Sequence, residues 1–142
     1  MGHYISVFTK ENNIDEVTCL VIAASNFIAQ YLFYESMNAQ EYNGGCSGNG
    51  EEKVFAKKEI EIAKAKLKYI STDDNIKYDI QRYSNDEKHD YFKDCIEKLS
   101  GNPSEVLTEV LSGEIDFEVE RINGFFDQIL QNKDEEVILW FG

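Results

Sequence analysis

The 142-residue sequence predicts a single α+β domain, residues 1–142, in which a helical core packs against a small sheet containing the N- and C-terminal strands. Short runs with strand character lie at both ends, and longer segments with helical spacing lie between them. The length suits one domain with a sizeable core, and the 42% hydrophobic content is that of an ordinary globular protein.

The two ends are rich in β-branched and aromatic residues. Residues 4–8 form the first run and residues 137–141 (VILWF) the last, and both are too short for helices. We therefore expect two strands that hold the termini in a sheet.

The segment after the first strand is apolar on nearly every helical face. Residues 17–34 carry no charged side chain, and Asn13 with Glu16 fits a capping box. This pattern predicts a central buried helix. A membrane span is disfavoured because Glu16 and Glu35, rather than basic residues, bracket the segment.

A glycine-rich stretch separates this helix from the next. Residues 43–50 (NGGCSGNG) hold four glycines and predict a loop. Residues 51–70 then show an apolar stripe and many lysines, which predicts an amphipathic helix.

Two further helices are expected, at residues 86–99 and at 103–113, the second opened by Pro103 and ended by Gly113. Residues 76–83 fit a strand or a helix. From Val119 onward the longer helical spacing favours a helix, while residues 114–118 fit either type.

The charge is strongly acidic, with a net charge of −13. The segment from Glu105 to the C-terminus contains ten carboxylates and only two basic residues, Arg121 and Lys133. This excess argues against nucleic acid and membrane as partners and favours a basic protein. Three cysteines at unrelated spacings and an N-terminus without a cleavable signal predict a cytoplasmic protein with reduced thiols.

Motifs for catalysis or metal binding are weak. Residues 44–48 match G-x-C-x-G around Cys46, but a nucleophile elbow needs a strand before the turn, so an ordinary connection is expected. The acidic residues 51–52 after the last glycine would repel a phosphate. Acidic residues near His89, within 86–90, fit a helix start better than a metal site. We predict a protein that is not an enzyme, with no catalytic residue, cofactor or metal.

The sharpest acidic feature is a regular row of carboxylates. In an extended chain the four would project from one face about 6.6 Å apart and could contact a basic partner. A solvated face that protects the sheet from aggregation is the competing interpretation. On a helix the four would scatter to two sides. These residues are Glu114, Asp116, Glu118 and Glu120.

The order of several parts resembles the immunity protein 70 family of bacterial polymorphic-toxin systems. These parts are the Met-Gly-His-Tyr opening with its strand, the turn at residues 46–51 followed by an apolar helix, Ile115-Asp116 with an amphipathic helix to Leu130, and the terminal VILWF. The aspartates and tryptophan of the family's Asp-Cys-Asp-Gly-Glu-Trp turn are missing here.

The resemblance implies a cytoplasmic protein that neutralises a cognate toxin, often a nuclease with a cationic cleft, by covering it. The expected contacts are Glu114, Asp116, Glu118 and Glu120. One alternative is a small-molecule-binding protein or enzyme that uses the glycine loop and Cys46. Another is an acidic mimic of nucleic acid that inhibits a DNA-binding protein.

Overall fold

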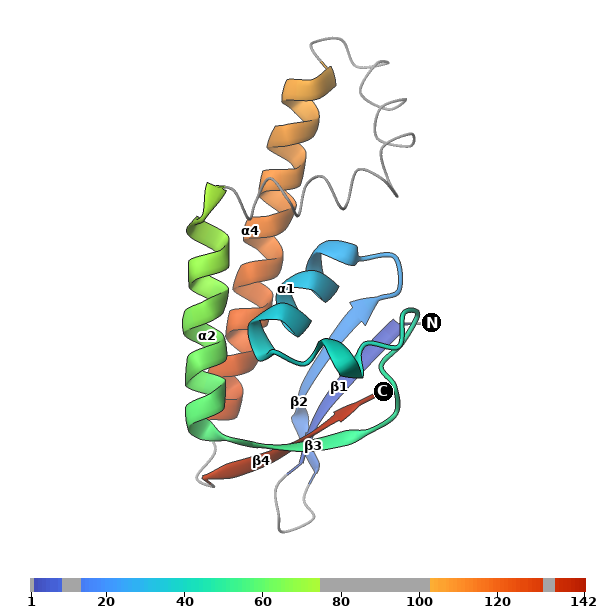
Figure 1. Cartoon of the computed structure of the whole chain (residues 1–142), viewed down its shortest axis with the longest axis vertical. Helices are drawn as coiled ribbons and strands as arrows, with labels where there is room; N and C mark the ends of the chain where they lie inside the picture. Colours follow the sequence, from blue (N-terminus) through green and yellow to red (C-terminus); the bar gives the residue numbers. More distant parts are fainter. Residues whose placement is uncertain (1, 9–13, 75–102, 132–134) are drawn as a thin grey trace.

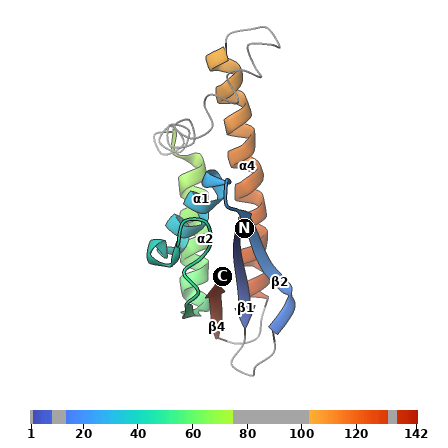
Figure 2. The same cartoon turned by 90° about the vertical axis from the view of Figure 1, so that its right-hand side faces the viewer.

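The computed structural model of the chain describes residues 2–8, 14–74, 103–131 and 135–142. It has the predicted α+β architecture, with helices packed on a four-stranded antiparallel sheet. Figures 1 and 2 show the helices and the sheet from two sides. In chain order the elements are β1 (Gly2–Phe8), β2 (Ile14–Ala23), α1 (Phe27–Met37), the 3-10 turn η1 (Gln40–Tyr42), β3 (Glu52–Ala56), α2 (Lys57–Thr72), α4 (Pro103–Leu130) and β4 (Glu136–Phe141).

The terminal strands form the centre of the sheet. The strand order is β2-β1-β4-β3, with Ile5 of β1 opposite Phe141 of β4. Tyr4 and Gly142 exchange both backbone hydrogen bonds at 3.0 Å, so the two ends of the chain lie side by side (Figure 1). The expectation that the sheet contains both terminal strands is confirmed.

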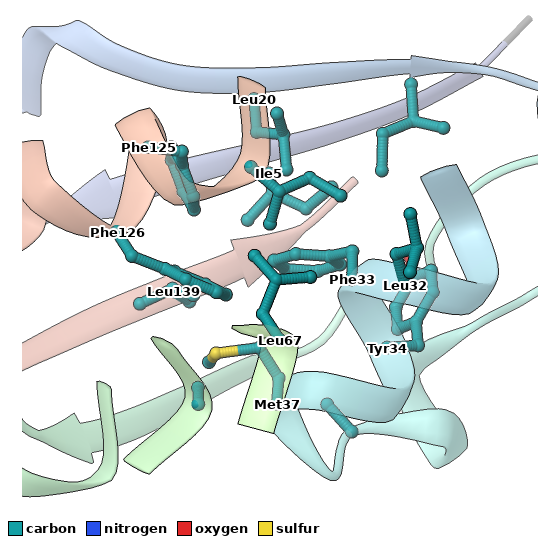
Figure 3. Packing of buried hydrophobic residues seen from close by; sticks show 14 of the residues in the cluster. Ile5, Leu20, Leu32, Phe33, Tyr34, Met37, Leu67, Phe125, Phe126 and Leu139 are labelled. Atoms are coloured by element: carbon teal, nitrogen blue, oxygen red, sulfur yellow. The ribbon is translucent and has the colours of Figure 1, made fainter. Parts of the chain in front are cut away.

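The core lies between one face of the sheet and the helices α1, α2 and α4. Phe33 of α1 sits at its centre, near Phe126 of α4 (Figure 3). The centroid of its ring lies 6.3 Å from that of Phe126 and 6.4 Å from that of Phe141. Leu67 of α2 and Leu139 of β4 close the same cluster, and both are fully buried. Burial of these side chains is the main stabilising contribution, since free energy scales with apolar area removed from water.

The predicted helix from Asn13 to Tyr34 is wrong in its first half. Residues 14–23 form strand β2, and the helix begins only after Asn26, whose side chain accepts a hydrogen bond from the backbone N–H of Ala29 at 3.1 Å. An apolar segment rich in Val and Ile suits either a buried helix or a strand. Pairing with β1, in the register Ile5 opposite Leu20, decides for the strand.

The predicted helix at residues 51–70 also begins with a strand. Residues 52–56 pair with β4, and α2 starts at Lys57, where the Glu59 carboxylate accepts a hydrogen bond from the Ala56 N–H. The pairing of Lys53, Val54 and Phe55 with β4 satisfies the backbone hydrogen-bonding groups on the side of β4 that faces away from β1. Local helix propensity loses to this pairing.

Helix α4 begins at Pro103 as predicted but does not end at Gly113. It continues to Leu130, so residues 114–118 are helical. A glycine inside a helix costs only about 1 kcal/mol relative to alanine. Burial of the α4 side chains Ile115, Ile122 and Phe126 outweighs that cost. The expected helix at 86–99 and the ambiguous segment 76–83 lie outside the described residues.

Candidate protein-interaction site

The four acidic residues of the predicted row lie on helix α4 and do not form one row. Glu118 points towards Asn26, whereas Asp116 and Glu120 point towards α2, and the helical repeat puts Glu114 on the side of Glu118. This is the scattered arrangement that a helix imposes, because residues two apart lie about 200° apart around its axis. The extended-face interpretation is therefore wrong for this segment.

Glu118 lies inside the fold, with only 7% of its surface exposed. One carboxylate oxygen accepts a hydrogen bond from the Asn26 side-chain amide at 2.9 Å. The other accepts from Arg121 Nε at 2.9 Å and lies 2.7 Å from Arg121 Nη2. We expected Glu118 at a partner surface. Instead it ties the N-terminus of α1 to α4, because a buried carboxylate needs charged and polar partners.

Arg121 extends this network to the edge of the sheet. The backbone groups of Tyr4 bond to Gly142, so those of its opposite residue, Val21, point to the free side of β2. The guanidinium Nη1 of Arg121 donates a hydrogen bond to the Val21 carbonyl. A side chain that covers an edge carbonyl protects that edge against strand addition.

Asp116 and Glu120 are exposed beside a shallow groove of about 410 Å³ between α2 and α4. Lys64 and Lys68 of α2 contribute to the same groove, so its walls carry both signs of charge. Lys64 is engaged in an ion pair with Asp127. The groove as a whole is therefore not a purely acidic surface.

Phe117, next to Asp116 on α4, is a residue that the sequence analysis did not single out. It is 63% exposed, among the most exposed large apolar side chains of the described residues. A signal was present, because Phe117 lies off the helical stripe formed by Ile115, Ile122 and Phe126. Aromatic residues are enriched at the centre of protein interfaces, so Phe117 is the side chain on this part of α4 that a partner could bury.

The glycine loop is bound firmly to the sheet. Gly48 donates its N–H to the Gly142 carbonyl at 2.9 Å, and Gly50 donates to the Phe141 carbonyl at 2.7 Å. Side chains larger than hydrogen have no room at Gly48, where a Cβ would lie 2.5 Å from the backbone of Phe141. Gly45, by contrast, has a positive φ of 94° in open space. The predicted glycine-rich loop is therefore present, and hydrogen bonds and close packing against the end of β4 fix its conformation.

His3 holds the tip of this loop from inside the protein. Its Nε2 lies 2.9 Å from the Gly45 carbonyl, which can only accept, so Nε2 carries the proton. Its Nδ1 then accepts from the Tyr34 hydroxyl at 2.7 Å. Burial lowers the pKa of His3, partly offset by the bond to Gly45, and burial raises the pKa of Tyr34 to about 12.

Cys46 is exposed on the glycine loop, and no strand leads directly into it, since the turn η1 precedes the loop. Both ring nitrogens of His3 are engaged with Tyr34 and Gly45. Among the described residues, Cys46 therefore lacks the strand and the base of a nucleophile elbow.

The candidate metal ligands at residues 86–90 lie outside the described residues. Within the described ranges, no three or more His, Cys, Asp or Glu side chains are grouped closely enough to hold a metal ion. No helix among the described residues is long and apolar enough to cross a membrane.

No family model, no curated protein and no solved structure matches this chain. Support for a function therefore comes from the chemistry of its own surfaces.

Proposed function

We propose that this protein is an immunity protein that binds a basic, nuclease-type toxin domain in the cytoplasm and neutralises it by charge-guided occlusion. The observation that carries the proposal is the exposed side of α4. There Asp116 and Glu120 lie on the side of α4 that faces α2, next to Phe117, which is 63% exposed. Such a surface combines charge that steers a cationic partner with an aromatic side chain that can be buried on contact.

Two of the cations near this side of α4 are engaged in ion pairs with other carboxylates. Arg121 is engaged with Glu118 and Lys64 with Asp127. Within the described part of the chain, Glu114, Asp116 and Glu120 form no ion pair. Their charges add to the net −13 of the whole protein and raise the association rate with a basic partner, especially at low salt.

The resemblance to the immunity protein 70 family supports the same class of function. Immunity proteins bind one cognate toxin, and the cationic cleft of a nuclease is complementary to an acidic surface. The chain's opening strand, its glycine loop and its terminal strand are the parts that carry this resemblance.

The probe for the test is a toxin domain identified among the products of the genes that flank the gene of this protein. Association rates are measured by biolayer interferometry at about 20 mM and about 300 mM NaCl. The Asp116→Lys/Glu120→Lys variant should associate severalfold more slowly, with the larger effect at low salt. The control, Glu41→Lys/Glu61→Lys, changes two exposed carboxylates elsewhere by the same charge and should change the rate less than about twofold.

Two outcomes contradict the proposal at different levels. Equal slowing by both variants would show that α4 is not the contact surface. A toxin domain that the protein neither binds nor neutralises in a growth assay would refute the immunity function itself.

A further inference from the structure

We propose that the outer face of the sheet is the apolar half of the same toxin-binding surface, an inference that rests on the proposed function. The outer face comprises the strand side chains that point away from the helices. Its members with large apolar side chains are Tyr4 and Phe8 of β1, Val21 of β2, Val54 of β3, and Ile138 and Trp140 of β4.

The composition of this face is not that of a solvated sheet. An antiparallel sheet with one covered face normally alternates apolar and polar residues, with the polar ones facing water. Here Tyr4 is 49% exposed, Val21 47%, Val54 48% and Trp140 36%. These are four of the seven large hydrophobic residues that are exposed in the described part of the chain.

The strand register brings these side chains into one patch. Tyr4 lies opposite Val21, and Val54 lies opposite Ile138, which in turn lies opposite Phe8. Between these two groups lies a row in which Ser6 is opposite Trp140, and Trp140 links the Val21–Tyr4 pair to the row formed by Phe8, Ile138 and Val54. A contiguous apolar patch of this kind marks an interaction site.

The Trp140 side chain and the backbone of Tyr4 are held in place before any partner arrives. Trp140 lies against Gly142, where a Cβ would come within 2.5 Å of the indole ring. The indole N–H donates a hydrogen bond to the Gly50 carbonyl at 3.3 Å. The backbone of Tyr4 is fixed by its two bonds to Gly142. Side chains that are already ordered lose little entropy on binding.

The charges around the patch identify its occupant as a basic protein surface. Glu52 occupies an exposed outward position, and the outward strand positions whose side chains the structure describes include no Lys or Arg. A second copy of this chain would bring another net charge of −13 against the first. The same charge disfavours an anionic membrane. The matching surface therefore has an apolar centre and a rim of Lys or Arg.

The outer face is continuous with the exposed side of α4. Arg121 bonds to the Val21 carbonyl, and the Val21 side chain belongs to the outer face. Phe117 lies one helical turn before Arg121 on the same side of α4. One partner can therefore contact Phe117, pass over the edge of β2 and cover Tyr4 and Trp140.

The test uses the same toxin domain as probe. Val21→Thr/Val54→Thr keeps β-branched residues in both strands and should raise the dissociation constant about tenfold, mainly through faster dissociation. The control, Ile62→Gln/Tyr69→Gln, removes two residues of similar exposure from α2 and should change it less than about twofold. Circular dichroism verifies that both variants fold.

Trp140 is the single tryptophan and reports directly on the patch. In protein labelled with 5-fluorotryptophan, its ¹⁹F resonance should shift when the toxin domain is bound. A toxin domain that binds both double variants with unchanged affinity and leaves the resonance in place would overturn this inference and keep the proposed function. A resonance that shifts with protein concentration in the absence of toxin would assign the face to a second copy and also overturn it. No binding by the wild-type protein would refute both proposals.

Discussion

Replacing Glu118 by alanine should lower the free energy of unfolding by about 3 kcal/mol. The change removes the acceptor of the Asn26 bond and of both contacts from Arg121. Hydrogen bonds to a charged group contribute about 1.5–3 kcal/mol each, and breaking a buried pair costs about 3–5 kcal/mol. The Arg121 side chain remains 31% exposed, so water can solvate it after the change, and the lower end of that range applies.

Glu118→Gln separates the charge from the shape of this side chain. Glutamine keeps an acceptor for Asn26 but weakens the contact with Arg121, so the expected loss is about 1–2 kcal/mol. Glu114→Ala is the matched control, since Glu114 lies one turn earlier on the same side of α4 and forms no described ion pair. Its effect should stay within about 0.5 kcal/mol.

Urea denaturation followed by circular dichroism measures these differences as shifts of the midpoint at constant slope. If Glu118→Ala and Glu114→Ala destabilised the protein equally, the buried network would not stabilise the fold, and the account of Glu118 given above would be refuted.

Three further predictions follow from the loop and the exposed helix. The free energy of unfolding should fall as the pH drops from about 7 to about 5.5. The reason is that His3 takes up a proton near pH 6.5 in the unfolded state, whereas burial lowers its pKa in the folded state. In urea titrations, His3→Gln should make the free energy of unfolding less dependent on pH over this range. In the same assay, Gly48→Ala should lower the free energy of unfolding by about 2 kcal/mol, because its Cβ would clash with the Phe141 backbone. Gly124→Ala lies in open space within α4 and should raise the free energy of unfolding by up to about 1 kcal/mol. Phe117→Ala should accelerate toxin dissociation about tenfold and leave the urea midpoint unchanged, and faster dissociation accompanied by lost stability would contradict its role as a surface contact.

The fold class and the terminal strands could be predicted because their signals are local. Residues 137–141 are too short and too rich in β-branched and aromatic side chains for a helix. Pro103 likewise marks the start of α4, since proline lacks the N–H that the first helical position leaves unpaired.

Strands β2 and β3 were missed because their conformation depends on distant residues. Residues 14–23 suit a buried helix as well as a strand, and only pairing with β1 selects the strand. This pairing joins residues that are far apart in the sequence, so the helix and strand propensities of a short stretch of residues cannot reveal it. The predicted end of the helix at Gly113 was wrong for a different reason. Glycine is a local helix-breaking signal, but the burial of apolar side chains farther along α4 outweighs it.

The sequence predicted an excess of negative charge on α4, but it did not predict which of the acidic residues lie on the surface. Regular spacing of Glu114, Asp116, Glu118 and Glu120 indicated one face only if the chain were extended. Helical geometry splits the four, and burial then removes Glu118 from the surface. Arg121, three residues after Glu118, was the available signal that this carboxylate has an internal partner.

The last strand connects the sequence pattern with the proposed interface. Residues 137–141 contain no polar side chain, and an uninterrupted apolar run is typical of a strand covered on both faces. In the described structure the helices cover one face, where Val137, Leu139 and Phe141 are fully buried, while Trp140 on the other face is 36% exposed. A strand that faced water on its outer side would have no need of Ile138 and Trp140 there, since polar residues would serve as well and resist aggregation better. The pattern of β4 therefore supports the proposal that a partner covers its second face, and the negative charge of the molecule favours a basic partner.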